Sequence, residues 1–162
     1  MLIFLDTEFT GLDQIKPDLI SIGLVDETGR EFYAELPHRS YQSQLTDWTR
    51  QNVVSHLWAG KYIQTPSQIS GRLAPWIAAC GKATVVSDCP SADFPFLRAL
   101  LPVWPKRLAK VAAAFEVQQP VIEETMSSYF HANRPRHHAL HDAHALRLGV
   151  FCAIENGWWQ KP

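Results

Sequence analysis

The chain has 162 residues, of which 46% are apolar, and its 15 basic and 16 acidic side chains leave a formal net charge of −1 at pH 7. This length predicts one domain over residues 1–162, with a core large enough to fold without disulfides. The charge balance excludes a polybasic nucleic-acid clamp and a basic membrane-surface helix, and the six tryptophans exclude disorder.

The first part of the chain predicts strands. The uninterrupted apolar run 2–5 ends at Asp6, as in a central strand that is covered on both faces. A second apolar run, 19–25, and an alternating run, 31–36, flank the turn residues 26–29. We therefore expect these two runs to form a β-hairpin.

Helices and further strands are expected in the rest of the chain. Helical spacing of apolar residues predicts a helix over 44–58 and another that runs to about Ala79, with Thr65 or Ser67 as its N-cap. The further expected elements are strands over 83–87 and near 108–113 and helices over 91–101, 122–130 and 139–154. Early strands followed by helices indicate a mixed α/β domain with helices packed on a sheet.

The segment DTEFTGL, at the end of the first strand, is the first candidate site. Residues i and i+2 of a strand point to the same face, so Asp6 and Glu8 present paired carboxylates. Such carboxylates in a low dielectric repel each other unless a cation neutralises them, and oxygen ligands suit Mg²⁺ or Mn²⁺. The alternative is that both acids are solvated at a strand end.

Asp142, in the segment HHALHDAHALRLGV, is the second candidate. Apolar side chains at helical spacing on either side of it predict a buried stripe, and Asp142 falls within that stripe. A buried carboxylate needs a partner, which is either a metal shared with the first two acids or an arginine such as Arg98 or Arg147.

His137 lies five residues before Asp142 and follows Pro135, which places it in a loop or in the first turn of the last helix. A histidine titrates near neutral pH, which suits a general base that takes a proton from water. Four other histidines crowd this region and are interpreted as surface or cap residues: His131, His138, His141 and His144.

The segment SDCPSADFPFL offers two more acids. Asp88 follows a predicted strand, and Asp93 lies in the first turn of a predicted helix. Because acids in a first turn ordinarily complement the helix dipole, neither acid by itself requires a functional explanation.

Together these residues resemble the DEDDh, or DnaQ-like, family of 3′–5′ exonucleases. DTEFTGL is similar to the first motif of that family through its DxExTGL core, and H-x-A-x-x-D-A, starting at His137, is similar to the third. The middle motif differs from the family pattern. Asp88 stands where the family has an asparagine, Ala92 stands where it has an aromatic residue, and one residue is inserted. We therefore assign the third acid of the family pattern to Asp93 and keep Asp88 as the alternative. The chain looks most like the small bacterial 3′–5′ exoribonucleases of this group.

The resemblance implies an α/β, RNase H-like fold, in which α-helices flank a mixed central β-sheet. It implies two divalent cations, Mg²⁺ or Mn²⁺, and His137 as the general base. The implied activity removes 5′-mononucleotides from the 3′ end of single-stranded RNA or from 3′ overhangs, and RNA is favoured over DNA by family likeness alone. The implied metal ligands are Asp6, Glu8, Asp93 and Asp142.

Substrate contacts are expected around the first and third motifs. Backbone near Gly11 would approach the terminal nucleotide, and Phe9 or Leu12 would stack on the last base. Arginines near the third motif would meet backbone phosphates. The expected substrate-binding residues are Thr7, Phe9, Thr10, Gly11, Leu12, Arg134 and Arg136.

The remaining patterns concern compartment and assembly. Three cysteines without a CxxC pair are typical of a reducing compartment, and the opening segment MLIFLD lacks the basic region of a secretory signal. No apolar run approaches the roughly twenty residues that span a bilayer, so we expect a cytoplasmic protein without a membrane partner. The aromatic tail at Trp158 and Trp159 is compatible with a homodimer face.

Three other functions stay open at this point. A doublet of His141 and Asp142 is also found in HD-type phosphohydrolases, but those proteins are all-helical. A histidine-rich metal-binding or sensory module would require the clustered histidines to bind zinc and would leave Asp6 and Glu8 without a function. A nucleic-acid-binding domain that has lost catalysis would not need the acids that this sequence retains.

Overall fold

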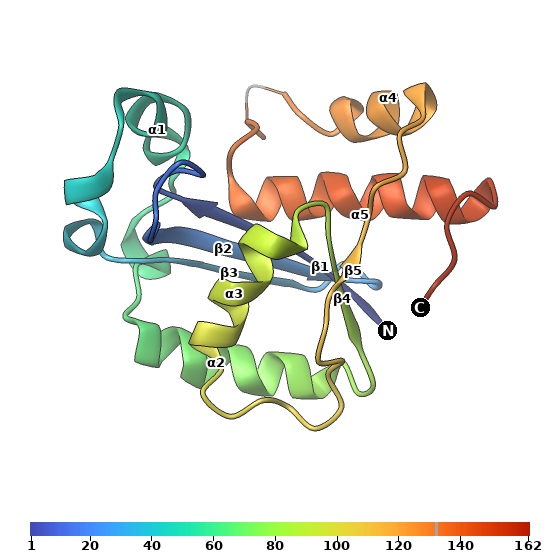
Figure 1. The fold of residues 1–162 in the computed structure, drawn as a ribbon, viewed down its shortest axis with the longest axis horizontal. Coiled ribbons are helices and arrows are strands. Elements are labelled where there is room, and N and C mark those ends of the chain that lie inside the picture. Colours follow the sequence, from blue (N-terminus) through green and yellow to red (C-terminus); the bar gives the residue numbers. More distant parts are fainter. Residues whose placement is uncertain (132) are drawn as a thin grey trace.

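The computed structural model describes residues 1–131 and 133–162, and a five-stranded mixed sheet lies at the centre of this part of the chain (Figure 1). The strand order is β3-β2-β1-β4-β5. β1 pairs antiparallel with β2 and parallel with β4, so its apolar run occupies the centre of the sheet. The strands are β1 (Leu2–Phe9), β2 (Leu19–Asp26), β3 (Glu31–Glu35), β4 (Thr84–Ser87) and β5 (Ala113–Ala114).

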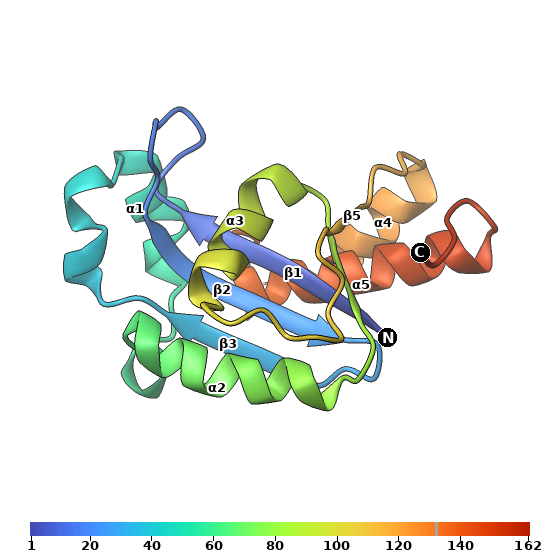
Figure 2. The same ribbon diagram turned by 60° about the horizontal axis from the view of Figure 1, so that its bottom comes forward.

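Helices cover both faces of this sheet (Figures 1 and 2). α5 and α4 lie on one face, whereas α2 and α3 lie on the other. The helices are α1 (Asp47–Asn52), α2 (Pro66–Ala79), α3 (Pro90–Leu100), α4 (Pro120–Ser128) and α5 (Ala139–Glu155). The expected mixed sheet flanked by helices is confirmed. Within the described residues, no helix combines the length and the apolarity needed to cross a membrane.

The alternation of side chains along β1 decides which residues face which helices. Leu2 and Phe4 pack in the core beneath α5, and the apolar residues between and after them pack in the larger core beneath α2 and α3. Asp6 and Glu8 continue the series that faces α5, because a strand repeats every two residues. Thr7 therefore points to the opposite face, where α3 lies.

The hairpin and the capped helix are confirmed. β2 and β3 pair antiparallel across the expected turn, in which the Asp26 carboxylate accepts hydrogen bonds from the backbone of Thr28 (2.9 Å) and Arg30 (3.0 Å). Thr65 caps α2, since its side chain accepts from the backbone of Gln68 and the Gln68 side chain accepts from the backbone of Thr65. This reciprocal pair satisfies two backbone donors at the helix start.

The continuous helix expected over 44–58 is wrong. Thr46 forms a capping box with Thr49, so α1 starts at Asp47, and short 3₁₀ turns precede and follow it. Its first turn carries Trp48, which is 54% exposed and does not face the core.

The strand expected near 108–113 is much shorter in the structure. Leu108 forms an isolated bridge with Ala83, and the regular strand β5 begins only at Ala113. Pairing here is limited to this bridge, in which Ala83 donates to the carbonyl of Arg107 (3.0 Å) and accepts from the N–H of Ala109 (2.9 Å).

The aromatic tail is divided between the interior and the surface. Trp159 packs against the core beneath α5, with its ring 6.1 Å from that of Phe115, whereas Trp158 is 43% exposed. Trp159 is therefore packed within the protein itself and needs no second copy of the chain to cover it. The homodimer face stays a prediction.

Candidate active site

Carboxylates from β1, α3 and α5 come together beyond the point where the parallel pairing of β1 with β4 ends. One oxygen from each of Asp6, Glu8 and Asp142 lies within 4.8 Å of the others. Asp6, Asp88 and Asp93 form a second such group within the same limit. Since Asp6 belongs to both groups, its carboxylate lies between two sets of oxygen ligands.

The position of Asp142 depends on a close approach between α5 and β2. Gly23 pairs with Asp6 across the two strands, and a Cβ atom on Gly23 would lie only 2.3 Å from the carbonyl carbon of Ala139. The missing side chain lets α5 begin directly over the strands, which brings its first turn to the acids. The backbone N–H of His138 donates to Asp142 Oδ2 (2.9 Å) and orients that carboxylate.

The arginines considered as partners of Asp142 are engaged elsewhere. Arg98 donates to the carbonyl of Lys110 (3.1 Å), and Arg147 donates to the carbonyl of Glu27 (2.9 Å). Neither arginine pairs with Asp142, whose carboxylate has an oxygen within 4.8 Å of oxygens of Asp6 and Glu8.

Asp93 is buried and held by three hydrogen bonds. Its Oδ1 accepts from the backbone N–H (3.1 Å) and the hydroxyl (2.6 Å) of Thr7, and its Oδ2 accepts from the hydroxyl of Ser87. Asp88, in contrast, is exposed. Asp93 is therefore the more rigidly held of the two acids, and it is also the one that the resemblance assigns to the middle motif.

Burial and mutual repulsion both disfavour the charged forms of these acids. Burial raises the pKa of Asp6 well above its ordinary range, and the charges of Glu8, Asp142 and Asp93 raise it further. Burial likewise raises the pKa of Glu8. It also raises the pKa of Asp93 and of Asp142 to about 6, against the hydrogen bonds that these two acids accept.

The oxygen atoms of this cluster fit a divalent cation. Asp6 Oδ2 is buried and has no hydrogen-bond partner among the described residues, although an unpaired buried oxygen is costly. Hard, oxygen-preferring cations would complete its coordination and offset the repulsion among the acids. The donor set is made of carboxylates alone, which suits Mg²⁺ or Mn²⁺ better than zinc.

A cavity of about 550 Å³ opens beside the acids and contains His137. Glu8 and His137 both line it. His137 precedes α5 and adopts a left-handed backbone conformation (φ 59°), and its ring makes an edge contact with Trp48 at 5.0 Å between centroids. Partial burial lowers the pKa of His137, and nearby His56 and Arg136 lower it further, so the imidazole is neutral at pH 7.

The expected substrate-binding residues of the first motif divide into two sets. Phe9, Thr10, Gly11 and Leu12 line the cavity beside Glu8. Thr7 is buried and does not line it, because both its donors are bound to Asp93. The two hydrogen bonds give Thr7 a role in positioning Asp93, and its contact with substrate stays a prediction.

The two arginines before the third motif lie over aromatic rings near α4. The Arg134 guanidinium is 4.7 Å from the centre of the Tyr129 ring, and that of Arg136 is 4.4 Å from the centre of the Phe130 ring. Both side chains are exposed. Their contact with phosphates stays a prediction.

The sequence interpretation missed several residues that line the cavity beside Glu8, of which Trp48 is the largest; the others are Asp13, Thr46 and Thr49. Trp48 was assigned to the apolar side of a long helix, whereas the structure places it at the cavity, beside Thr46 and Thr49. The signal was present in Thr46 and Thr49, because a helix capped at Thr46 carries residue 48 in its exposed first turn.

The clustered histidines stack on aromatic rings. His138 is fully buried and stacks on Tyr33 (4.6 Å) and His141 (4.2 Å), and His144 stacks on Tyr129 (5.4 Å). Within the described residues, both groups able to hold a metal are made of carboxylates, and neither includes a histidine. This packing argues against a histidine-based zinc module, and the sheet excludes an all-helical HD domain.

Comparison with known proteins agrees with this geometry. A comparison with protein-family models matches residues 1–150 to the 3′–5′ exoribonuclease Rv2179c-like domain. A search of curated proteins found no match. The mixed sheet with strand order β3-β2-β1-β4-β5 and its flanking helices is the RNase H-like exonuclease fold. Since the matched segment covers most of the sequence, the chain belongs to the Rv2179c-like 3′–5′ exoribonuclease family, a family of hydrolases of the small bacterial DEDDh type.

Proposed function

We propose that the chain hydrolyses single-stranded RNA, including 3′ overhangs, from the 3′ end and releases nucleoside 5′-monophosphates with the help of two divalent cations. The observation that carries the proposal is the position of Asp6, whose carboxylate is shared by two groups of acids. Such sharing suits a pair of neighbouring cations, which act on both the attacking and the leaving oxygen of a phosphodiester.

The two groups supply different ligands. Asp6, Glu8 and Asp142 would hold one cation, and Asp6 and Asp93 would hold the other, with Asp88 as the alternative ligand. Bound Mg²⁺ or Mn²⁺ supplies Lewis-acid stabilisation of the negative charge that develops on the phosphate. The phosphodiester adds a negative charge to four acids, so the substrate and the cations are expected to bind together.

His137 is proposed as the general base. Its lowered pKa keeps the imidazole neutral at pH 7, so that it can accept the proton of the attacking water. The ring lines the same cavity as Glu8, and its contact with Trp48 limits its orientation.

The terminal nucleotide is proposed to occupy the cavity beside His137. Leu12 is 81% exposed at its edge, and Trp48 presents a large aromatic surface. Apolar and aromatic surfaces of this kind accept any base, which suits a nuclease that removes successive nucleotides. A 2′-hydroxyl contact would explain a preference for RNA over DNA.

The test uses a 5′-labelled single-stranded RNA and a DNA of the same sequence, each incubated with Mg²⁺, Mn²⁺ or EDTA. We expect a descending ladder and free 5′-monophosphates from the RNA with either metal, and no reaction in EDTA. Asp6→Asn should be inactive while it keeps the wild-type circular dichroism spectrum. Undegraded RNA, internal cleavage, or full activity in excess EDTA would contradict the proposal.

A further inference from the structure

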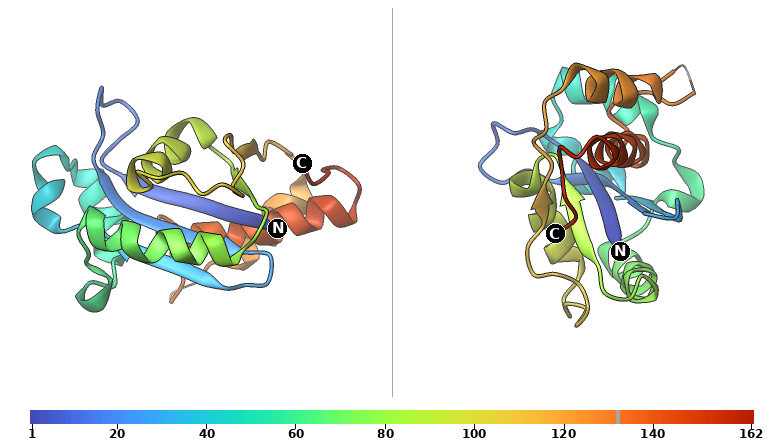
Figure 3. Two further views of the ribbon diagram at one scale, coloured as in Figure 1. Left: turned by 90° about the horizontal axis from the view of Figure 1, so that it is seen from below. Right: turned by 90° about the vertical axis from the view of Figure 1, so that its right-hand side faces the viewer.

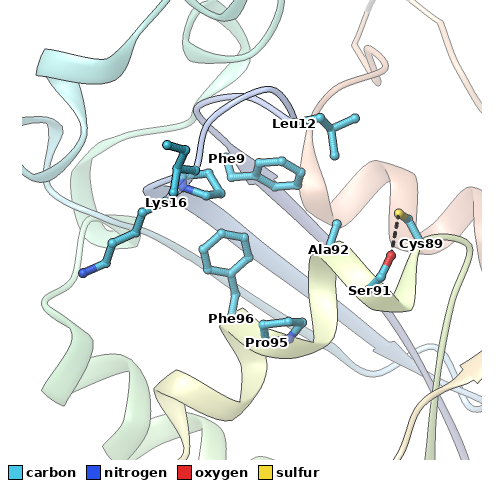
Figure 4. Close-up of a pocket in the computed structure, with 10 residues that line it drawn as sticks. Phe9, Leu12, Lys16, Cys89, Ser91, Ala92, Pro95 and Phe96 are labelled. Atoms are coloured by element: carbon cyan, nitrogen blue, oxygen red, sulfur yellow. Dashed lines mark hydrogen bonds between the residues drawn. The ribbon is translucent and has the colours of Figure 1, made fainter.

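Aromatic rings lie on both faces of the sheet beside the acids. On the side of α3, Phe9 and Phe96 face each other with their centroids 5.4 Å apart (Figure 4). On the other side, α5 lies along the sheet (Figure 3), and the residue that precedes its first turn is His138. The backbone N–H of His138 orients Asp142, whereas its ring has no part in the proposed reaction.

The ring of His138 is enclosed completely by the protein. Its exposed fraction is zero, and neither ring nitrogen has a hydrogen-bond partner among the described residues. Burial and the charge of nearby His141 lower the pKa of His138 to about 3, so the imidazole is uncharged at neutral pH. The ring therefore contributes to the structure as an aromatic surface and not as a hydrogen-bonding group.

Three rings from different parts of the chain pack against this imidazole. Tyr33 of β3 and His141 of α5 stack on it, with their centroids 4.6 and 4.2 Å away. The ring of Trp58, from the segment between α1 and α2, is also 4.6 Å away and inclined by 39°. We call Tyr33, Trp58 and His141 the aromatic cluster. It joins β3, α5 and the segment before α2 around the His138 ring.

A buried carboxylate fixes two members of the aromatic cluster. Glu35, the last residue of β3, accepts hydrogen bonds from the backbone N–H of Trp58 (2.7 Å) and from the hydroxyl of Tyr33 (3.0 Å). It also accepts from the N–H of Ala59 (3.0 Å), which has a left-handed φ of 57°. An alanine adopts this conformation only where other contacts impose it. Glu35 therefore holds the Trp58 ring against His138.

The backbone of His138 joins two residues of the proposed mechanism. Its N–H donates to the Asp142 carboxylate (2.9 Å), and its carbonyl accepts from the N–H of Asp142 (3.0 Å). His137 directly precedes it and has a φ of 59°, which is unfavourable for a residue with a side chain. Of residues 133–138, His138 alone is buried. Its ring is therefore the anchor of the segment that carries His137.

We propose that His138 is a positioning residue, whose ring in the aromatic cluster fixes the backbone that carries His137 and orients Asp142. The inference rests on the proposed function, because it takes His137 as the general base. Without the ring, the segment 133–138 would lose its buried anchor, and the strained backbone at His137 would relax. The His137 imidazole would then move away from Glu8, whereas the cavity wall formed by residues 9–13 would stay in place.

The experiment measures kcat and KM for a 5′-labelled single-stranded RNA with Mn²⁺. It compares the wild-type protein with His138→Ala, His138→Phe, Trp58→Ala and Trp76→Ala. Trp76→Ala is the matched control for the removal of a tryptophan. Trp76 also packs on an aromatic ring, that of Phe32 at 6.1 Å, but it lies in α2 on the opposite face of the sheet.

We expect His138→Ala to lower kcat about a hundredfold with little change in KM, which is the effect of a small displacement of a catalytic group. His138→Phe should restore most of the kcat, because it supplies a ring and the nitrogens of His138 make no hydrogen bond. Trp58→Ala should also lower kcat, and it should cause little further loss when it is combined with His138→Ala. Trp76→Ala should keep the wild-type kcat.

Amide hydrogen exchange of the metal-free protein gives a readout that does not depend on cleavage. The amides of His138 and Asp142 bond within the segment that the ring anchors. They should exchange faster in His138→Ala and in Trp58→Ala than in the wild type, and at the wild-type rate in Trp76→Ala.

The outcomes separate this inference from the proposed function. Wild-type kcat in His138→Ala, an equal loss of kcat in Trp76→Ala, or no recovery in a folded His138→Phe protein would overturn the inference. Trp58 is 43% exposed, so Trp58→Ala decides the matter if the His138 variants do not fold: an unchanged kcat in it would overturn the inference. Absence of cleavage by the wild-type protein, with the expected exchange pattern, would instead overturn the proposed function.

Discussion

Thr7 and Asp93 are joined by two hydrogen bonds to a single carboxylate oxygen, from the backbone N–H at 3.1 Å and from the hydroxyl at 2.6 Å. The parallel pairing of β1 with β4 extends only to Phe4 and Val86. Beyond that point the side of β1 that faced β4 has no neighbouring strand. The Asp93 side chain accepts the hydrogen bond from the Thr7 N–H that a neighbouring strand would otherwise accept. The end of β1 and the start of α3 are thereby fixed to each other.

Thr7→Val tests this relationship, because valine keeps the branched shape of threonine and removes only the hydroxyl. A lost hydrogen bond to a charged group should lower kcat about tenfold, with little change in KM. The matched control is Thr28→Val, which removes an equivalent hydroxyl bond of 2.6 Å to Asp26 at the opposite end of the sheet. A loss of activity in Thr28→Val as large as in Thr7→Val would contradict the prediction.

The choice between the two acids of the middle motif can be decided by amide substitutions. Asp93→Asn should lower kcat at least about a hundredfold, because Asp93 is buried and rigidly placed beside Asp6. Asp88→Asn should have a much smaller effect, since that side chain is exposed. Steady-state rates at saturating Mn²⁺ measure both. The reverse order of the two effects would make Asp88 the ligand.

The contact between Gly23 and α5 predicts a defect that is both structural and catalytic. A Cβ on Gly23 would overlap the backbone at Ala139, so Gly23→Ala should push the start of α5 away from the sheet and move Asp142. We expect a loss of about 1–3 kcal/mol in the free energy of unfolding together with most of the activity.

Gly71→Ala is the control for that variant. Gly71 lies within α2, and nothing lies within 4 Å of the position that its Cβ would take. The substitution should therefore stabilise the protein by about 0.5–1 kcal/mol without changing its activity. Urea unfolding of both variants measures the difference. Equal stabilities would show that α5 does not depend on the bare backbone at residue 23.

Local patterns were sufficient to predict the parts of the fold that depend on neighbouring residues. The apolar run before Asp6 and the turn residues after Val25 specify strands and their hairpin, and the Thr65 cap specifies the start of α2. Asp142 could be placed on a helix because its neighbours repeat at helical spacing.

Long-range contacts could not be read from such patterns. No local signal shows that Gly23 lies under Ala139, that Thr7 donates to Asp93, or that Trp48 reaches His137. Each contact joins residues from different elements, and only the packed tertiary structure determines it. The hydrogen bonds of Thr7 to Asp93 were therefore not expected, and Trp48 was counted among the regularly spaced apolar residues of a helix over 44–58.

The repulsion among the acids predicts that these carboxylates destabilise the metal-free protein increasingly as the pH rises. Asp93 and Asp142 have a pKa of about 6 in the folded protein, against roughly 3.9 for an aspartate in an unfolded chain. Between these values the two acids bind more protons in the folded than in the unfolded state, so their contribution to stability is greatest below about pH 4 and is lost as the pH rises through about 6.

Thermal unfolding in EDTA across pH 4–8 measures this decline. Added Mn²⁺ should raise the Tm more at pH 7.5 than at pH 5, because protons compete for the same oxygens. Asp6→Asn should raise the Tm of the metal-free protein at pH 7.5 and should abolish the effect of Mn²⁺. A metal-free Tm that depends on pH in the same way in the wild type and in Asp6→Asn would contradict the account of the site.

The pH dependence of cleavage tests the role of His137 and its contact with Trp48. A general base acts in its neutral form, so the rate at saturating Mn²⁺ should rise with pH, and the midpoint of the rise should lie below the ordinary histidine pKa of about 6.5. His137→Gln should lower kcat by about 10²–10⁴-fold and remove this rise. Trp48→Ala removes the ring that packs against the imidazole and should move the rise to higher pH, because burial is the largest cause of the lowered pKa. Trp48→Phe should largely preserve the profile. A rise that persists unchanged in His137→Gln would belong to the carboxylates and would remove His137 from the mechanism.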